Sequence, residues 1–576
     1  MNRFRFRSLL FAFLLVPMAG LAQQFQTAQP AQSAQPAVSI RVDATQKLGP
    51  FKPIWGYFGY DEPNYTTMPN GRKLIAELAA LSATPVHIRT HNLLTTGDGT
   101  PALKWGSTNA YTEDASGKPI YDWTIMDQIL DTYVQSKAKP FIEIGFMPKA
   151  LSTHPEPYQH TWPKGGIDTG WAYPPKDYQR WGELVRQWAA HSVARYGREE
   201  AESWYWEVWN EPDIFYWHGS PEEYDQLYDH AAAAVKTVLP GARVGGPATT
   251  GPAGKSGAAF LRQFLDHCAR GKNYATGGEG APLDFISYHA KGRPEVAEGR
   301  VRMGLARHLQ DVDTGLAVIA EFPRFQNLPI VLSESDPEGC AACSAKGYPQ
   351  NAYRNGPLYP AYTALELSSI LKLADRRHAD IEGMLTWAFE FENQPYFEGF
   401  RTLATNGIDK PILNLFRMLG LMGHMAGERV NVESSGALGL DSILMQGVRE
   451  QPDVDALAAA SEHEVSVLVW NYRDQDESGT QAAGAPIKLT LAGLPRSAGR
   501  VLMHHYRIDG DHSNSYSLWK ELGSPPSPTP EQYAQIEAAG QLQMLESPRW
   551  LTNNGGELQI DFTLPLQGVS LVVLSW

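Results

Sequence analysis

Two glutamates, Glu207 and Glu211, lie inside the apolar stretch WYWEVWNEPD at residues 204–213. A carboxylate among tryptophans loses its hydration, so we expect it either to be paired with a cation or to take part in a reaction. A third glutamate, Glu334, follows the apolar run PIVLS. Two carboxylates at neighbouring strand ends are the groups that hydrolyse a glycosidic bond, one as proton donor and the other as nucleophile.

The structural alternative is that these glutamates are salt-bridge partners. Glu211 is preceded by Asn210 and followed by Pro212, and an Asn side chain at that position can contact a sugar hydroxyl. This pattern favours a chemical role for Glu211. Glu207 lies in the middle of the same run, and we expect it to support the structure.

Short β-rich runs alternate with longer amphipathic stretches over most of the chain. The expected strands are 54–59, 86–90, 141–145, 204–210, 242–246, 285–289, 330–333 and 384–388. The expected helices are 72–81, 125–135, 176–196, 221–239, 258–269, 300–320, 359–376 and 412–424. Eight such pairs predict an α/β fold, a (β/α)8 or TIM barrel at 49–425, with functional residues at the C-terminal ends of its strands.

The pattern changes after residue 425. Alternating or apolar runs at 464–472, 487–493, 501–508 and 557–576 predict an antiparallel β-sandwich over 426–576, interrupted by one helix at 528–540. We expect a strand at 39–48, within VSIRVDA and beyond, to join this sandwich. We read the sandwich as structural support, since no aromatic pattern marks it as a carbohydrate-binding module.

The N-terminus has the pattern of a secretory signal. Three arginines precede a short apolar core, and Gly-Leu-Ala at 20–22 offers a cleavage site. We expect a signal peptide at 1–22, a low-complexity linker at 23–38, and export to the periplasm or the outside of the cell. The alternative is an uncleaved anchor, for which the apolar run is short and interrupted by Pro and Gly.

The composition limits the partners. The chain has 576 residues and a formal net charge of −14, which argues against nucleic acid or an anionic membrane as the main partner. The sequence gives no indication of the oligomeric state.

Three cysteines are present. Cys340 and Cys343 form a lone C-A-A-C shortly after Glu334, without the two further ligands that a zinc site needs. We therefore expect a local disulfide that shapes a loop near the active site, and a buried free thiol at Cys268.

Several stretches, in order along the chain, resemble glycoside hydrolase family 39, the family of β-xylosidases and α-L-iduronidases, within the large clan of retaining barrel glycosidases. They are PFIEIGFMPKAL (140–151), WYWEVWNEPDIFYW (204–217), DFISYHAKG (284–292), PIVLSES (329–335), GMLTWAFEFE (383–392) and HSNSYSLWKELGSP (512–525). The resemblance runs from about residue 40 to the C-terminus.

The resemblance implies roles for individual residues. Glu211 matches the general acid/base and Glu334 the nucleophile. The residues that match sugar-contacting or pocket-lining positions are Asn210, Arg89, His91, His289, Trp387, Phe146 and Glu392. The clan also implies a cis peptide between Trp387 and Ala388. The family mechanism needs no metal and no organic cofactor.

The resemblance implies an exo-acting β-xylosidase that releases xylose from xylo-oligosaccharides with retained configuration. One departure weakens this specificity, because family members often carry His-x-Tyr where this chain has His289-Ala290-Lys291. A β-glucosidase, an α-L-arabinosidase or a uronic-acid glycosidase remains open, and Lys291 or Arg293 would suit a uronic acid. A non-catalytic sugar-binding protein is the rival from another class, disfavoured because both carboxylates are present. The long insert at 95–118 is expected to shape the rim of the site.

Overall fold

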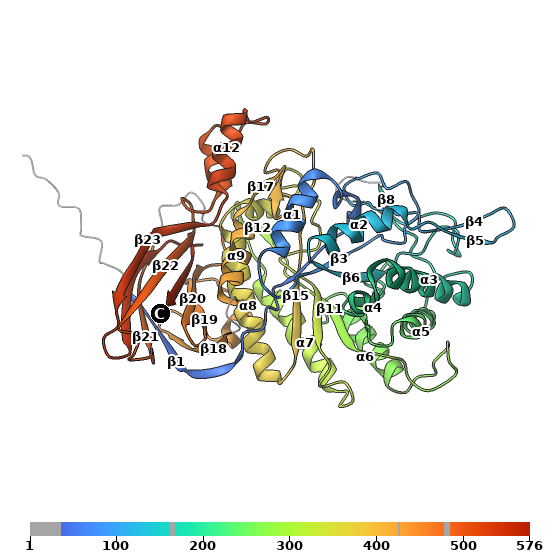
Figure 1. Cartoon of the computed structure of the whole chain (residues 1–576), viewed down its shortest axis with the longest axis horizontal. Helices are drawn as coiled ribbons and strands as arrows, with labels where there is room; N and C mark the ends of the chain where they lie inside the picture. The colour runs from blue at the N-terminus through green and yellow to red at the C-terminus, as the bar shows by residue number, and fades with distance from the viewer. Residues whose placement is uncertain (1–35, 162–166, 424–426, 477–483) are drawn as a thin grey trace, which may run out of the picture. The chain divides into compact units, whose positions relative to one another are not determined.

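The computed structural model describes residues 36–161, 167–423, 427–476 and 484–576 (Figure 1). The predicted signal peptide and nearly all of the predicted linker lie outside these residues. Residues Ala37–Trp576 form one compact unit. Among the described residues, no helix combines the length and the apolarity that a membrane crossing requires.

A closed parallel barrel forms the larger part of the chain, which confirms the predicted (β/α)8 fold. Its strands, in the order in which they pair around the barrel, are β10 (Arg243–Thr249), β11 (Phe285–Lys291), β14 (Ile330–Asp336), β15 (Ile381–Trp387), β2 (Tyr57–Tyr60), β3 (His87–Thr90), β6 (Lys139–Ile144) and β9 (Tyr205–Val208). Each overlaps a strand expected from the sequence. Their C-terminal ends therefore meet at one mouth of the barrel.

Helices surround the barrel. They are α1 (Pro69–Ala79), α2 (Thr124–Gln135), α3 (Tyr178–Tyr196), α4 (Arg198–Glu202), α5 (Pro221–Val238), α6 (Lys255–Arg270), α7 (Leu305–Ala320), α8 (Leu358–Arg377) and α9 (Pro411–Gly423). The start of α5 follows from its sequence, because Ser220 and Glu223 form a reciprocal capping box. The helix expected at 300–320 begins only at Leu305, since Arg300–Arg302 form the strand β13.

The second domain is a nine-stranded sheet. In pairing order it contains β23 (Gln543–Thr552), β22 (Arg500–Ile508), β25 (Val569–Ser575), β20 (Glu464–Tyr472), β19 (Asp453–Ala460), β18 (Glu428–Ser434), β1 (Val38–Pro50), β21 (Ala485–Ala492) and β24 (Glu557–Leu564). All neighbours are antiparallel except β1 and β21, which are parallel. Residues of β22 and of β24 share one hydrophobic core, so strands from both ends of the sheet pack against each other.

The sheet domain packs on the barrel helices α8 and α9. Trp470 and Tyr472 of β20 and Leu571 of β25 belong to the same hydrophobic cluster as the barrel residues. Arg429 and Asp375 form a paired contact across this boundary, with guanidinium–carboxylate distances of 2.7 and 2.8 Å. The sheet thus stabilises the barrel at the side of its last two helices.

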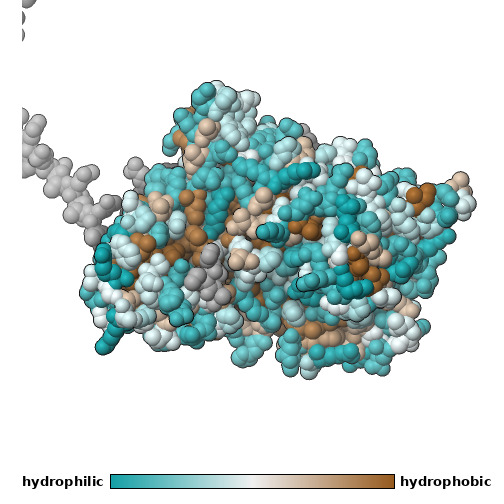
Figure 2. All heavy atoms as spheres, in the orientation of Figure 1, coloured by the Kyte–Doolittle hydropathy of each residue, from teal (hydrophilic) through white to brown (hydrophobic). Residues whose placement is uncertain are grey.

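The remaining elements are short. They are the strands β4 (Tyr111–Glu113), β5 (Pro119–Tyr121), β7 (Gln159–His160), β8 (Ile167–Asp168), β12 (Glu295–Ala297), β13, β16 (Ala404–Thr405) and β17 (Ile408–Asp409), the helices α10 (Leu440–Gln446), α11 (Ser515–Glu521) and α12 (Pro530–Ala539), and the 3-10 turns Pro63–Tyr65 and Pro349–Asn355. The molecular face in Figure 2 is largely hydrophilic, with apolar residues in small scattered areas, in keeping with the acidic composition.

Candidate active site

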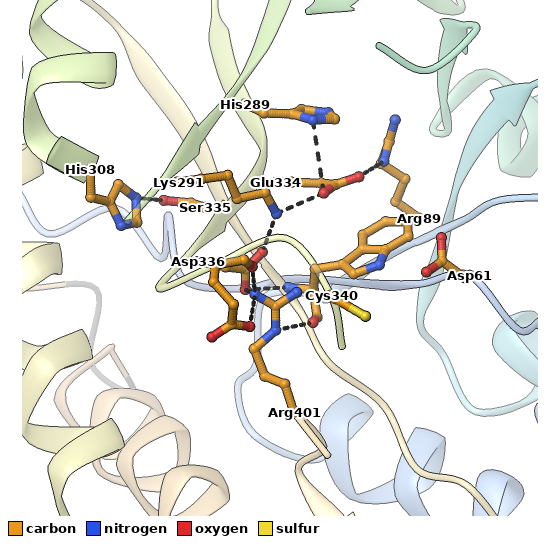
Figure 3. A network of polar contacts seen from close by, with 12 residues as sticks. Asp61, Arg89, His289, Lys291, His308, Glu334, Ser335, Asp336, Cys340 and Arg401 are labelled. Carbon is orange, nitrogen blue, oxygen red and sulfur yellow. Dashed lines mark hydrogen bonds and ion pairs between the residues drawn. The ribbon is translucent and has the colours of Figure 1, made fainter. Parts of the chain in front are cut away.

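A cavity of about 200 Å³ lies among the predicted site residues at the C-terminal mouth of the barrel. It is lined by Asp61, His91, Lys104, Asn210, Glu211, Ile214, Phe215, Tyr216, Lys291, Glu334, Gly339, Cys340 and Trp387. Figure 3 shows part of its wall, with Glu334 between Arg89, His289 and Lys291. Residues from six barrel strands or their following loops therefore meet here, as the positions of the strand ends predict.

Arg89, at the end of β3, lies beneath the cavity and is fully buried. Its Nε lies 2.6 Å from an oxygen of Glu207, its Nη2 3.1 Å from Glu143, and its Nη1 3.2 Å from Glu334. Its Nη2 also donates to Oδ1 of Asn210 at 3.1 Å. One guanidinium thus positions three carboxylates and the asparagine that precedes Glu211. Arg89 supports the site from below and does not itself line the cavity.

Glu207 and Glu143 are the buried partners of this arginine. Both side chains are inaccessible to solvent, and neither lines the cavity. They lie side by side on the neighbouring parallel strands β9 and β6, where they are register partners. The structure therefore places Glu207 in a supporting position, as the sequence pattern suggests.

Glu334 is surrounded by cationic groups. Its Oε2 accepts a hydrogen bond from Nζ of Lys291 at 2.7 Å and lies 3.8 Å from Nδ1 of His289. Its Oε1 lies 3.5 Å from Nε2 of His91. Burial alone would raise the pKa of Glu334, but His289, Lys291 and His91 together hold that pKa well below its usual value. The surrounding cations therefore favour the ionised form of Glu334.

Glu211 has a different environment. Its side chain is 15% exposed, against 7% for Glu334, and one of its oxygens lies 2.8 Å from Nδ1 of His289. The backbone carries Glu211 out of the strand in an uncommon conformation, with φ of 44°, after Trp209 at 73°. Its N–H donates to the carbonyl oxygen of Ala248 at 2.9 Å, which fixes this turn. The carboxyl group faces the open side of the cavity.

The two cavity glutamates are close. One oxygen of Glu211, one of Glu334 and one nitrogen of His289 all lie within 4.8 Å of one another. Such a trio has the donors of a metal site, but Lys291 and Arg89 already neutralise Glu334, and a metal ion there would meet their positive charge. We therefore assign no metal to this trio.

His91 connects Glu334 to a second buried ion pair. Its Nδ1 lies 2.7 Å from Asp61 and its Nε2 2.8 Å from Glu143. Burial would lower the pKa of His91, but Glu143, Asp61 and Glu334 raise it well above its usual value. Lys104 in turn pairs with Asp61. Sequence reasoning missed Asp61 and Lys104. Asp61 lies two residues beyond the expected first strand (54–59), which is a usable signal, whereas nothing marks Lys104 within its long insert.

Trp387 and Phe146, two further predicted residues, lie at different places relative to the cavity. Trp387 lines the cavity, with its ring 4.2 Å from that of His91. Its ring packs over Gly59, where a Cβ atom would meet it at 2.5 Å, so no larger residue fits there. Phe146 is buried behind the cavity, against Trp209 and His91. It supports the wall without lining it.

Two expectations are wrong. Glu392 does not reach the cavity, because the chain turns away after Trp387 and the Glu392 carboxylate accepts a hydrogen bond from the backbone of Asn70 at 2.7 Å, in a separate surface hollow. The Trp387–Ala388 peptide is not cis, and the non-proline cis bond lies at Gly145–Phe146. The backbone of Trp387 is held by Asp336, whose carboxylate accepts a hydrogen bond from the Trp387 N–H at 2.9 Å.

The loop after β14 forms the wall beside the nucleophile. Cys340 and Cys343 are bonded to each other in it, and Cys268 is a buried free thiol. The guanidinium of Arg354 donates to the carbonyl oxygens of Cys340 and Cys343, each at 2.6 Å. Gly339 and Cys340 thereby become a fixed part of the cavity wall.

Comparison with known proteins places this geometry in a family. The model of glycosyl hydrolases family 39 matches residues 38–558. A β-xylosidase of Caldicellulosiruptor saccharolyticus is 28% identical over 78% of this chain and 82% of its own. An α-L-iduronidase of Mus musculus is 25% identical over 92% of this chain and 80% of its own.

Solved structures agree in fold. A monomeric β-xylosidase from Caulobacter crescentus CB15 superposes with a TM-score of 0.72 at 24% identity, covering 93% of this chain and 99% of that one. A bacterial orthologue of human α-L-iduronidase gives the same TM-score at 22% identity, covering 93% and 84%. Both kinds of enzyme are thus similar to this chain to a comparable degree.

The Arg89 arrangement makes a prediction about stability. Replacing Arg89 by Met leaves three carboxylates without their shared cation, two of them fully buried, and we expect the free energy of unfolding to fall by about 3–5 kcal/mol. Arg262→Met is the control, because Arg262 pairs with Glu321 at the exposed surface, where such a pair contributes about 0–1 kcal/mol. Chemical denaturation of both variants measures the difference. Equal losses would contradict the central role given to Arg89.

Proposed function

Because this chain belongs to glycosyl hydrolases family 39, we propose that it is a retaining exo-glycosidase that releases β-linked xylose from the non-reducing ends of xylo-oligosaccharides. The observation that carries the retaining mechanism is the approach of Glu211 and Glu334 to within 4.8 Å. Retaining enzymes place their two carboxyl groups about 5–5.5 Å apart, whereas inverting enzymes leave about 6.5–9.5 Å for a water molecule.

The environments of the two glutamates support different roles. Glu334, ionised among Arg89, His91 and Lys291, attacks the anomeric carbon and forms a glycosyl ester. As the C1–O bond breaks, Glu211 gives its proton to the departing oxygen. A water molecule then attacks C1, Glu211 takes one of its protons, and the ester bond to Glu334 breaks. Two inversions at C1 leave the configuration unchanged.

The choice of sugar depends on what faces C5. A β-D-xyloside, a β-D-glucuronide and an α-L-iduronide present the same configuration at C1, so one pair of glutamates serves all three. They differ at C5, where xylose carries only hydrogen. The ammonium group of Lys291 is bound to both Glu334 and Asp336, at 2.7 and 2.8 Å, so its charge is already balanced. This favours a sugar without a carboxylate.

A second candidate is a uronic-acid glycoside. Lys291 lines the cavity, and an ammonium group has three protons, of which two are used by Glu334 and Asp336. The third is available to a substrate carboxylate. The two candidates therefore differ in whether Lys291 binds substrate or only positions the nucleophile.

The N-terminal sequence pattern leads us to propose that the protein is exported and loses residues 1–22. We expect intact-mass measurement of the protein from its native host to show a chain that begins at Gln23. A chain that retains Met1 would contradict this.

The first test is kinetic. Aryl glycosides of xylose, glucose, arabinose, glucuronic acid and iduronic acid are offered to the wild type, and we expect the β-xyloside to give the highest kcat/KM. Glu334→Ala should lose roughly 1,000-fold or more in kcat. Glu392→Ala is the matched control, because this glutamate lies outside the cavity, and it should stay within about twofold.

The same panel separates the roles of the two glutamates. Glu211→Ala should hydrolyse dinitrophenyl glycosides, whose leaving group needs no proton, far better than glycosides of poorer leaving groups. Glu334→Ala should lose activity on both to the same extent. An identical pattern for the two variants would overturn the assigned roles, and a best rate on a uronide would overturn the choice of xylose.

A pH profile tests the part played by Lys291. The Lys291 ammonium helps to hold the pKa of Glu334 down, so the wild-type nucleophile stays ionised as the pH falls. Lys291→Met removes that charge and lets the pKa rise, so the acid limb of the kcat/KM profile should move to higher pH. Lys291→Arg, which keeps the charge, should leave the limb near its wild-type position. A profile unchanged in Lys291→Met would refute this electrostatic role.

The activity of Lys291→Met on uronides distinguishes the two candidate substrates, a xyloside and a uronic-acid glycoside. If Lys291 binds a substrate carboxylate, Lys291→Met should lose roughly 10- to 100-fold more kcat/KM on a uronide than on a xyloside. If Lys291 only positions Glu334, the loss should be the same on both.

A further inference from the structure

Asp61 and Lys104 form an ion pair in the cavity wall that the double-displacement mechanism does not use. Asp61 follows β2, and Lys104 lies in the 95–118 insert between β3 and β4. Only 4% of Asp61 and 7% of Lys104 is exposed, and both residues line the cavity. The Lys104 ammonium donates to Oδ2 of Asp61. Oδ2 of Asp61 thus contacts Lys104 and its Oδ1 contacts His91, and the lone pairs and ammonium protons left over can meet a ligand in the cavity.

The insert is attached so that Lys104 has a defined place. The N–H of Lys104 donates to Glu62 at 2.8 Å. The Asn64 side chain makes a two-way contact with the backbone of Ser107, donating to its carbonyl at 2.9 Å and accepting from its N–H at 3.0 Å. Three residues of the loop after β2, Asp61, Glu62 and Asn64, thus hold the insert. The Lys104 side chain therefore has a defined position in the cavity wall.

The Asp61–Lys104 pair lies away from Glu211, the residue that is proposed to protonate the leaving group. Around the barrel, β9, which precedes Glu211, is followed by β6, β3 and then β2, which precedes Asp61. Asp61 Oδ1 also accepts from Nδ1 of His91 at 2.7 Å, which ties the pair to the nucleophile side of the cavity. Since the bond to be cleaved lies between Glu211 and Glu334, the pair faces ring carbons remote from C1.

A buried ion pair is weak evidence of stabilisation, because the cost of removing two charges from water offsets their attraction. A carboxylate that accepts and an ammonium that donates are, however, the groups that recognise neighbouring sugar hydroxyls. A pair that is buried, fixed and directed at a cavity has the properties of a binding site.

We propose that Asp61 and Lys104 close the non-reducing end of the cavity and bind the hydroxyl groups at C3 and C4 of the terminal sugar. This inference rests on the proposed function and adds its specificity element. A sugar substituted at O4 would collide with the pair, so the pair also makes the enzyme exo-acting. The insert that carries Lys104 is then the element that converts an open barrel mouth into a closed pocket.

The test uses a variant that keeps the charge balance. Asp61→Asn/Lys104→Met removes both charges together, so no buried charge is left alone. Wild type and variant are compared on the leading aryl glycoside and on its 3-deoxy and 4-deoxy analogues, as ratios of kcat/KM. We expect the wild type to discriminate against at least one analogue by about 100-fold or more, and the variant by less than about 5-fold. Lys149→Met, at an exposed lysine, is the control and should keep the wild-type ratio.

The ratio distinguishes recognition from a structural role. If the double variant is slower on all three substrates but keeps the wild-type ratio, the pair only supports the wall and the proposal is wrong. A wild type that does not discriminate at either position overturns it as well. Should the double variant fail to fold, Lys104→Gln gives the same comparison. Inactivity of the wild type on every parent glycoside would refute the proposed function, and this inference with it.

Discussion

The arrangement of the site depends on one buried guanidinium. Arg89 lies at the end of β3 and contacts Glu143 from β6, Glu207 from β9 and Glu334 from β14. Burying three carboxylates in a barrel is possible only because a cation compensates them, and an arginine has five donors in a rigid plane to satisfy several at once. The same contacts fix the side chain of Asn210, next to Glu211. Both cavity glutamates are therefore positioned by a residue that a substrate does not touch.

This compensation also sets the difference between the two glutamates. Glu334 has cationic groups on both of its oxygens, whereas Glu211 is more exposed and contacts His289. Two carboxylates within 4.8 Å of each other would otherwise compete for one proton. The cations gather on the Glu334 side of the cavity, so the two carboxyl groups have unlike electrostatic surroundings. His289 lies near both glutamates, with its Nδ1 2.8 Å from Glu211 and 3.8 Å from Glu334.

The sequence predicts the fold, and it predicts that Glu211 and Glu334 meet at one mouth of the barrel, for physical reasons. Barrel strands are short and apolar, and their helices are strongly periodic, so all eight pairs were visible, and the Asn-Glu-Pro turn marks a strand end. The sheet was predicted less completely. β19 (DVDALAAA) has little β-propensity, and β23 contains Ser-Pro, so both were missed. Glu392 was misplaced because sequence distance from Trp387 does not show where the chain turns.

Asp61 and Lys104 show the limit of such reasoning most clearly. They are 43 residues apart, and their contact depends on how an irregular insert folds back over the loop after β2. No periodic pattern in the sequence indicates how this insert folds. Glu211 and Glu334 lie at strand ends, whose positions follow from the barrel itself, whereas Lys104 lies on a loop whose path is set by a few hydrogen bonds. If specificity depends on residues of this second kind, then relatives with the same pair of glutamates can act on different sugars. The chain is similar to a β-xylosidase and to an α-L-iduronidase at 28% and 25% identity, so overall similarity does not distinguish these two activities.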